Sequence, residues 1–74
     1  MNGQPYHMRP WDEVLGPVHE VEEEDGHCLA LIGKIPVILP QELAIKIRAL
    51  TGQKIGILRT ERDYRLRVCD QRRS

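Results

Sequence analysis

The chain has 74 residues, of which 11 are basic and 11 acidic, so its net charge is zero. A domain of this size has a thin core that contributes only about 3–5 kcal/mol of net stability without a staple or a partner. Its two cysteines are too few for a disulfide scaffold, and no apolar run approaches the roughly 20 residues that span a membrane. We therefore expect a cytoplasmic protein without a membrane partner.

The N-terminal stretch shows no hydrophobic periodicity, and it lacks the basic start and apolar run of a signal peptide. We expect residues 1–10 to form a flexible arm, residues 11–70 a single β-rich domain, and residues 71–74 a basic C-terminal tail. Trp11, the only tryptophan, is predicted to cover one end of the core, because an indole ring offers much apolar area to a small domain. The alternative is an exposed contact residue.

Three strand-like segments follow, joined by two tight turns. Asp25-Gly26 is a two-residue hairpin signal, because both central residues of such a turn need positive φ. Gly33-Lys34 predicts a second turn, of type II′, with glycine at the first central position. Gly16-Pro17 indicates a bend or bulge in the first strand, and Pro36 places the third strand at an edge or bulge. The predicted strands cover residues 14–22, 27–32 and 35–39.

A single helix is predicted after the third strand. Pro40 fits the first turn, where a missing N–H has no cost, and Gly52 fits the left-handed position that ends a helix. Apolar residues at helical spacing lie between them. The helix is therefore predicted over residues 41–51, with a buried stripe of Leu43, Ile47 and Leu50 that is deepest at Ile47.

A second hairpin is predicted near the C-terminus, with strands over residues 54–59 and 64–69. The register that pairs Arg59 with Tyr64 puts the apolar residues of both strands on one face. Its further pairs are Ile57 with Leu66 and Ile55 with Val68. The opposite face then carries Leu58, Arg65, Arg67 and Cys69.

The predicted element order is β-β-β-α-β-β. Over residues 14–69 this order resembles the OB-fold, a five-stranded barrel with a helix between its third and fourth strands. The resemblance is one of topology, and it implies a small, mainly β domain of the α+β class with five strands and barrel-like curvature. An SH3-like barrel, or an open sheet covered by one helix, is the alternative that the same order allows.

The sequence offers little for catalysis. Its only serine is Ser74, and His27 and Cys28 are strand neighbours whose side chains point to opposite faces. The potential metal ligands show no metal-site spacing; they are His19, His27, Cys28 and Cys69. We therefore expect no cofactor and no metal, and we favour a non-catalytic binding module over an enzyme.

Charge is divided along the chain. Residues 1–45 carry two bases and eight acids, a net charge of −6, whereas residues 46–74 carry nine bases and three acids, a net charge of +6. Arginine forks suit phosphate, so a basic strand face beside Tyr64 predicts weak, sequence-independent binding of single-stranded nucleic acid. The predicted site comprises Arg59, Arg62, Arg65, Arg67, Arg72 and Arg73. The alternative is that the two halves neutralise each other within one fold.

A protein partner is the competing prediction. In the second and third strands apolar residues occur on both faces, and a sheet that is apolar on both sides needs a cover on both sides. The helix covers one side only. The other side carries Leu29, Leu31 and Ile38, which we predict to contact a second copy of the chain, another protein or the N-terminal arm.

Overall fold

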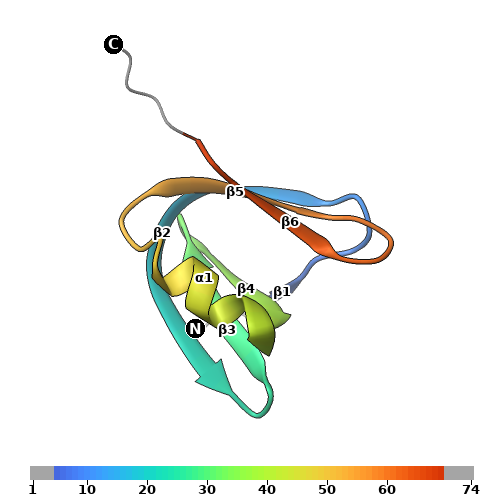
Figure 1. The fold of residues 1–74 in the computed structure, drawn as a ribbon, viewed down its shortest axis with the longest axis horizontal. Coiled ribbons are helices and arrows are strands. Elements are labelled where there is room, and N and C mark those ends of the chain that lie inside the picture. The colour runs from blue at the N-terminus through green and yellow to red at the C-terminus, as the bar shows by residue number, and fades with distance from the viewer. Residues whose placement is uncertain (1–4, 70–74) are drawn as a thin grey trace.

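The computed structural model describes residues 5–69, which fold into a curled sheet of six strands with one short helix. The strands are β1 (Tyr6–His7), β2 (Glu13–Glu24), β3 (His27–Ile32), β4 (Ile35–Pro40), β5 (Lys54–Arg59) and β6 (Tyr64–Val68). A 3-10 turn, η1 (Gln41–Leu43), and the helix α1 (Ala44–Arg48) connect β4 to β5. The strand order is β1-β4-β3-β2-β5-β6, and α1 lies in the hollow of the curl (Figure 1).

Both predicted tight turns form where their sequences require them. Asp25 and Gly26 have φ values of 44° and 85°, so both central residues of the β2–β3 turn lie in the left-handed region. In the β3–β4 turn Gly33 has a φ of 62°, while Lys34 keeps a negative φ, as a type II′ turn requires. These turns confirm the two hairpins and set the register of the first three long strands.

Side-chain alternation determines the pairing of the long strands. In the C-terminal hairpin the predicted register is confirmed, with Arg59 opposite Tyr64 and Ile57 opposite Leu66. In the β3–β4 hairpin Ala30 lies opposite Val37, which is the register that the predicted two-residue turn at Gly33-Lys34 implies. A shift by one residue would move every buried side chain to the solvent face, so the apolar pattern selects one register.

The curl of the sheet comes from the length of β2. Its first half pairs with β5 and its second half pairs with β3, and the register shifts between Val18 and Glu20, just after the Gly16-Pro17 pair at which a bend or bulge was predicted. Gly16 lies where β2 crosses the β3–β4 turn, and a Cβ there would stand 3.1 Å from the backbone nitrogen of Gly33. One bent strand therefore joins two hairpins into a half-barrel.

The sheet has six strands where five were expected, because β1 forms within the predicted arm. Tyr6 and His7 pair in parallel with β4, and the side chain of Met8 is only 1% exposed. A strand of two residues has no periodicity to read, and the strand with which it pairs, β4, is distant in sequence. The mainly β class with one helix and barrel-like curvature is confirmed, although the sheet stays open.

The helix occupies the predicted place but is shorter than predicted. Residues 41–43 form a 3-10 turn, and the α-helix ends at Arg48, after which Leu50 and Thr51 donate backbone hydrogen bonds three residues back. Ile47 is fully buried at the centre of the stripe, as predicted, whereas Leu43 and Leu50 are half-buried. The helix therefore buries only Ala44 and Ile47, against the curled sheet.

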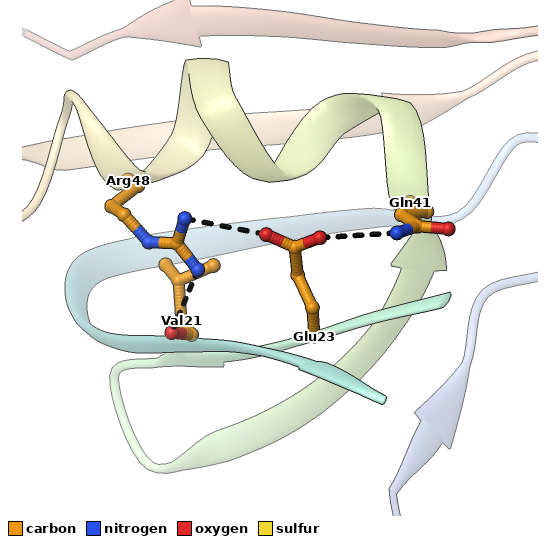
Figure 2. Close-up of polar contacts among 4 residues, drawn as sticks. All are labelled: Val21, Glu23, Gln41 and Arg48. Atoms are coloured by element: carbon orange, nitrogen blue, oxygen red, sulfur yellow. Dashed lines mark hydrogen bonds and ion pairs between the residues drawn. The ribbon is translucent and has the colours of Figure 1, made fainter. Parts of the chain in front are cut away.

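A polar contact fixes the helical segment to the acidic end of β2. The carboxylate of Glu23 accepts hydrogen bonds from Gln41 at 3.1 Å and from Arg48 at 3.3 Å, and Arg48 also donates to the carbonyl of Val21 at 3.5 Å (Figure 2). The amide of Gln41 and then the guanidinium of Arg48 hold the pKa of Glu23 below its ordinary value. Glu23, one of several glutamates at the end of β2, is thus matched within the fold.

Candidate nucleic-acid interface

The outer face of the β5–β6 hairpin carries the predicted basic residues. Arg65 and Arg67 are exposed, and they lie opposite Leu58 and Gly56 on the neighbouring strand. The next strand, β2, adds Glu13 to the first of these rows and Leu15 to the second. Two short rows of side chains therefore cross three strands on this face.

Gly56 makes a depression between the rows. A Cβ at this position would stand 2.9 Å from Cδ2 of Leu15 and 3.4 Å from Nε of Arg67, so only glycine lets both side chains lie over the strand. The resulting hollow has a volume of about 420 Å³ and includes Glu13, Leu58 and Arg65 in its lining. A residue without a side chain thus creates space on an otherwise flat sheet face.

A second hollow, of about 380 Å³, adjoins the first near the β5–β6 turn. The two hollows share Leu58 and Arg65, and we call them together the outer groove. The second hollow is lined by Trp11, Leu58, Thr60, Glu61, Arg62, Asp63 and Arg65. An indole ring and two arginines therefore stand around one depression.

Trp11 is 61% exposed, so the prediction that it covers the core is wrong. Residues 9–12 form a turn in which the backbone N–H of Asp12 donates to the carbonyl of Arg9 at 2.9 Å. Pro10 stands at the second position of this turn and Trp11 at the third, with a φ of 74°. This conformation directs the ring away from the core, and Met8 fills part of the core in its place.

The carboxylate of Asp12 holds this turn in place. It accepts hydrogen bonds from the hydroxyl of Tyr6 at 2.5 Å and from the backbone N–H of Arg9 at 2.8 Å. The Tyr6 hydroxyl and then the Arg9 N–H lower the pKa of Asp12, and the same contact raises the pKa of Tyr6. Two side chains, those of Tyr6 and Asp12, and the backbone N–H of Arg9 therefore hold Trp11 in its exposed position, and all three groups lie close to it in sequence.

Comparison of the chain with protein-family models, with curated proteins and with solved structures finds no match in any of the three.

The charge of the outer groove is mixed. Arg67 forms an ion pair with Glu13 at 3.5 Å, and the two side chains are 69% and 42% exposed. A pair this exposed is weak, because water screens it and both long side chains lose freedom in making it. Glu61 and Asp63 also line the groove, and the Asp63 carboxylate accepts a hydrogen bond from the Thr60 hydroxyl at 2.8 Å. An anion that binds in the groove would thus compete with these carboxylates for the arginines, and the exposed Arg67–Glu13 pair is weak enough to be displaced.

The predicted arginines do not all lie together. Arg62, Arg65 and Arg67 line the outer groove, whereas Arg59 projects to the inner face. The guanidinium of Arg59 stands 5.4 Å from the ring centroid of Tyr64 and donates to the backbone carbonyl of Met8. Arg72 and Arg73 lie outside the described residues. Trp11 is not among the predicted site residues, although its exposure was the alternative stated for it, and proline at the preceding turn position was the available signal.

The other predicted surface lies on the outer face of β3 and β4. Leu29, Leu31 and Ile38 are each half-buried, and Ile38 pairs with His7 of β1. The two leucines line a hollow of about 250 Å³, together with Glu20, Glu22 and Pro36. This face is therefore both apolar and acidic, in contrast to the outer groove.

The candidate reactive and ligating groups lie apart. Cys28 is fully buried in the core, and its burial raises the pKa of the thiol, which keeps it protonated at neutral pH. Among residues 5–69, no three His, Cys, Asp or Glu side chains are grouped so that they could hold a metal ion. No helix in this described part is long and apolar enough to cross a membrane.

Proposed function

We propose that the chain is a non-catalytic binding module that holds single-stranded nucleic acid in the outer groove, weakly and without sequence preference. The observation that carries the proposal is the exposed ring of Trp11 beside Arg62 and Arg65. Proteins that bind single strands combine aromatic rings, on which bases stack, with cationic groups along the backbone path. Arginine suits the second task because its planar fork matches a phosphate group.

The spacing of the groups supports the same function. Arg65 and Arg67 are two residues apart on one face of β6, which separates them by about 7 Å along the strand. Neighbouring phosphates of an extended single strand can reach both guanidinium groups. Trp11 then lies beyond Arg65 along the same groove, where it can stack with a base of the bound strand.

The mixed charge predicts low affinity. Glu13, Glu61 and Asp63 line the same groove as the arginines, so each phosphate contact competes with a nearby carboxylate. We expect binding at low salt that weakens with a log–log slope of about −0.7 per phosphate neutralised. A single exposed indole supplies stacking for about one base, worth about 1–3 kcal/mol.

The resemblance to OB-folds supports part of this proposal. OB-folds bind oligonucleotides on their second and third strands and on the loops after strands one and four. In this chain the second and third long strands carry the acidic hollow with Glu20 and Glu22, which would repel phosphate. The loop after the fourth long strand is residues 60–63, and it lines the outer groove. We therefore place the nucleic acid at that loop and not on β3–β4.

The test is a titration with an unstructured oligonucleotide at low and moderate salt, followed by the fluorescence of Trp11, the only tryptophan. We expect quenching on binding, and loss of binding in the double variant Arg65→Glu, Arg67→Glu. Lys34→Glu, Lys46→Glu is the matched control, because it makes the same change in net charge at exposed positions outside the groove. If both double variants bind alike while folded, or wild type does not bind at low salt, the proposal fails.

A second candidate is homodimerisation through the outer face of β3–β4. The half-buried pair Leu29 and Leu31 beside a 250 Å³ hollow is the observation that favours it. Light scattering should then give a dimer mass for wild type and a monomer mass for Leu31→Gln. A monomer mass for wild type at high concentration would contradict this candidate and leave the first untouched.

A further inference from the structure

Among residues 5–69, the last strand of the sheet has one edge that pairs with no other strand. Strand β6 pairs with β5 and ends the sheet on that side (Figure 1). The N–H of Cys69 donates to the carbonyl of Lys54, and the N–H of Thr60 donates to the carbonyl of Asp63, both at 2.8 Å. These bonds mark the two ends of the ladder and therefore its phase.

Bonded and non-bonded residues alternate along an antiparallel pair, so the phase decides which backbone groups stay free. Counting inward from Cys69, the N–H and C=O groups of Arg67 and Arg65 point toward β5. The groups of Tyr64, Leu66 and Val68 point the other way, into the free edge. The register of β5 with β6 runs without a bulge, so this edge is regular along its whole length.

The two faces of this edge differ in chemistry. On the outer face Arg65 and Arg67 are exposed. On the inner face Tyr64 and Leu66 are half-buried against the core, and Val68 is 45% exposed. A strand laid along β6 would thus meet two cations on one side and apolar side chains on the other.

We propose that β6 accepts an extended acidic peptide by antiparallel strand addition, which goes beyond the nucleic-acid function proposed above. The fitting peptide alternates apolar residues, which cover Leu66 and Val68, with acidic residues, which face Arg65 and Arg67. Main-chain hydrogen bonds at an exposed sheet edge provide affinity, and alternate side chains provide specificity. The antiparallel direction is chosen because it is the more stable pairing per residue.

A second copy of the chain does not fit this edge. When two β6 strands pair antiparallel and overlap fully about Leu66, Arg65 of each faces Arg67 of the other, and like charges directly opposite are destabilising. The acidic end of β2 in a second copy could not serve as the added strand either, because both of its edges already make contacts within its own chain. Residues 20–24 of β2 pair with β3 along one edge, and at the other edge Arg48 donates to the carbonyl of Val21. Charge therefore favours a foreign acidic strand over self-association.

The test uses a short synthetic peptide that alternates glutamate and valine. Nuclear magnetic resonance should show slowed exchange of the amide protons of Tyr64, Leu66 and Val68 in the complex, and little change at Arg65 and Arg67. Residues opposite each other in a sheet share a face, so the valines lie opposite Leu66 and Val68 on the inner face. The backbone groups of the valines therefore form the hydrogen bonds to β6. N-methylation of its valines should then abolish binding, while N-methylation of its glutamates should not. Binding that survives valine methylation overturns the proposal.

A proline variant examines the same edge from the protein side. Leu66→Pro removes an N–H that points away from β5, so the β5–β6 ladder is retained. Leu66→Ala is the control for the lost side chain. We expect Leu66→Pro to bind the peptide about tenfold more weakly than Leu66→Ala. Equal affinities in folded variants contradict the proposal.

A charge exchange keeps the test valid if the proline variant fails to fold. The double variant Arg65→Glu, Arg67→Glu should lose the glutamate–valine peptide and bind a lysine–valine peptide instead. If wild type and the double variant bind both peptides with equal affinity, the arginines do not determine which peptide binds, and the proposal is contradicted. Trp11→Ala separates the two proposals, because it should weaken oligonucleotide binding and leave peptide binding unchanged.

Discussion

The β2–β3 and β5–β6 hairpins have the same architecture but differ in how far the rest of the chain contacts them. Each is an antiparallel pair of the same sheet, with alternating core and solvent positions. The first has an acidic tip whose Glu23 is bound by Gln41 and Arg48, and its β3 strand is followed by β4. The second ends the sheet, and its arginines face a groove. The acidic hairpin is held by its own chain, whereas the basic hairpin leaves groups available to a ligand.

This difference qualifies the charge division of the sequence. Arg48 belongs to the basic half, yet it is engaged by Glu23 of the acidic half, and Arg67 is engaged by Glu13. The two halves therefore do neutralise each other in part. The weakly paired Arg67 remains available to a ligand together with Arg62 and Arg65, and all three line the outer groove beside Trp11. Net charge per half thus overstates the field that a ligand would meet.

The largest expected effect is on the helix that lies in the hollow of the curled sheet (Figure 1). Ile47 is fully buried, so Ile47→Ala should lower the free energy of unfolding by about 2–5 kcal/mol. Ile45, on the same helix, is 78% exposed, and Ile45→Ala should change it by less than about 0.5 kcal/mol. Chemical denaturation measures both. An unchanged midpoint for Ile47→Ala would contradict the packing of α1 in the curl.

Trp11 provides a smaller and more specific effect. At most positions glycine makes a folded protein less stable than alanine does. At a φ of 74°, however, the Cβ of alanine introduces backbone strain that glycine avoids. We therefore expect Trp11→Gly to be more stable than Trp11→Ala by about 1 kcal/mol, in thermal or chemical unfolding. Both variants should bind oligonucleotides equally poorly, since both lack the ring. Greater stability of the alanine variant would contradict the turn at residues 9–12.

The long strands and their registers follow from local rules. Asp25-Gly26 specifies a turn, and the alternation of Ile55, Ile57, Leu66 and Val68 specifies a face, so short-range patterns were sufficient. The placement of β1 and of Trp11 depends on long-range contacts, among them the pairing of Tyr6 with Val37. The groove depends on Gly56, whose role appears only when Leu15 is brought over it by the β2–β5 pairing. The sequence pattern of a single strand or turn cannot predict contacts of this kind, because they depend on residues from other elements.

The smallest expected effect concerns the acidic hairpin. The pKa of Glu23 is lower in the folded state than in the unfolded chain. As the pH falls, the unfolded chain therefore binds a proton at this group first. The stability that Glu23 contributes is then lost as the pH falls through the pKa of the folded state. Its contribution is therefore present at neutral pH and disappears under acid conditions below the ordinary pKa of glutamate. Glu23→Gln should lower the melting temperature slightly at neutral pH and have less effect in acid.

Two controls make this small effect interpretable. Glu22→Gln removes the same charge from the opposite face of β2, and it serves as the reference for the change in net charge. Arg48→Gln removes one of the two partners of Glu23, so it should reduce the pH dependence in the same direction as Glu23→Gln. Because the contact is exposed, added salt should weaken the Arg48 part of it. If Glu23→Gln and Glu22→Gln show the same pH profile of melting temperature, the contact does not hold the acidic hairpin, and the contrast between the two hairpins is reduced to the free edge of β6.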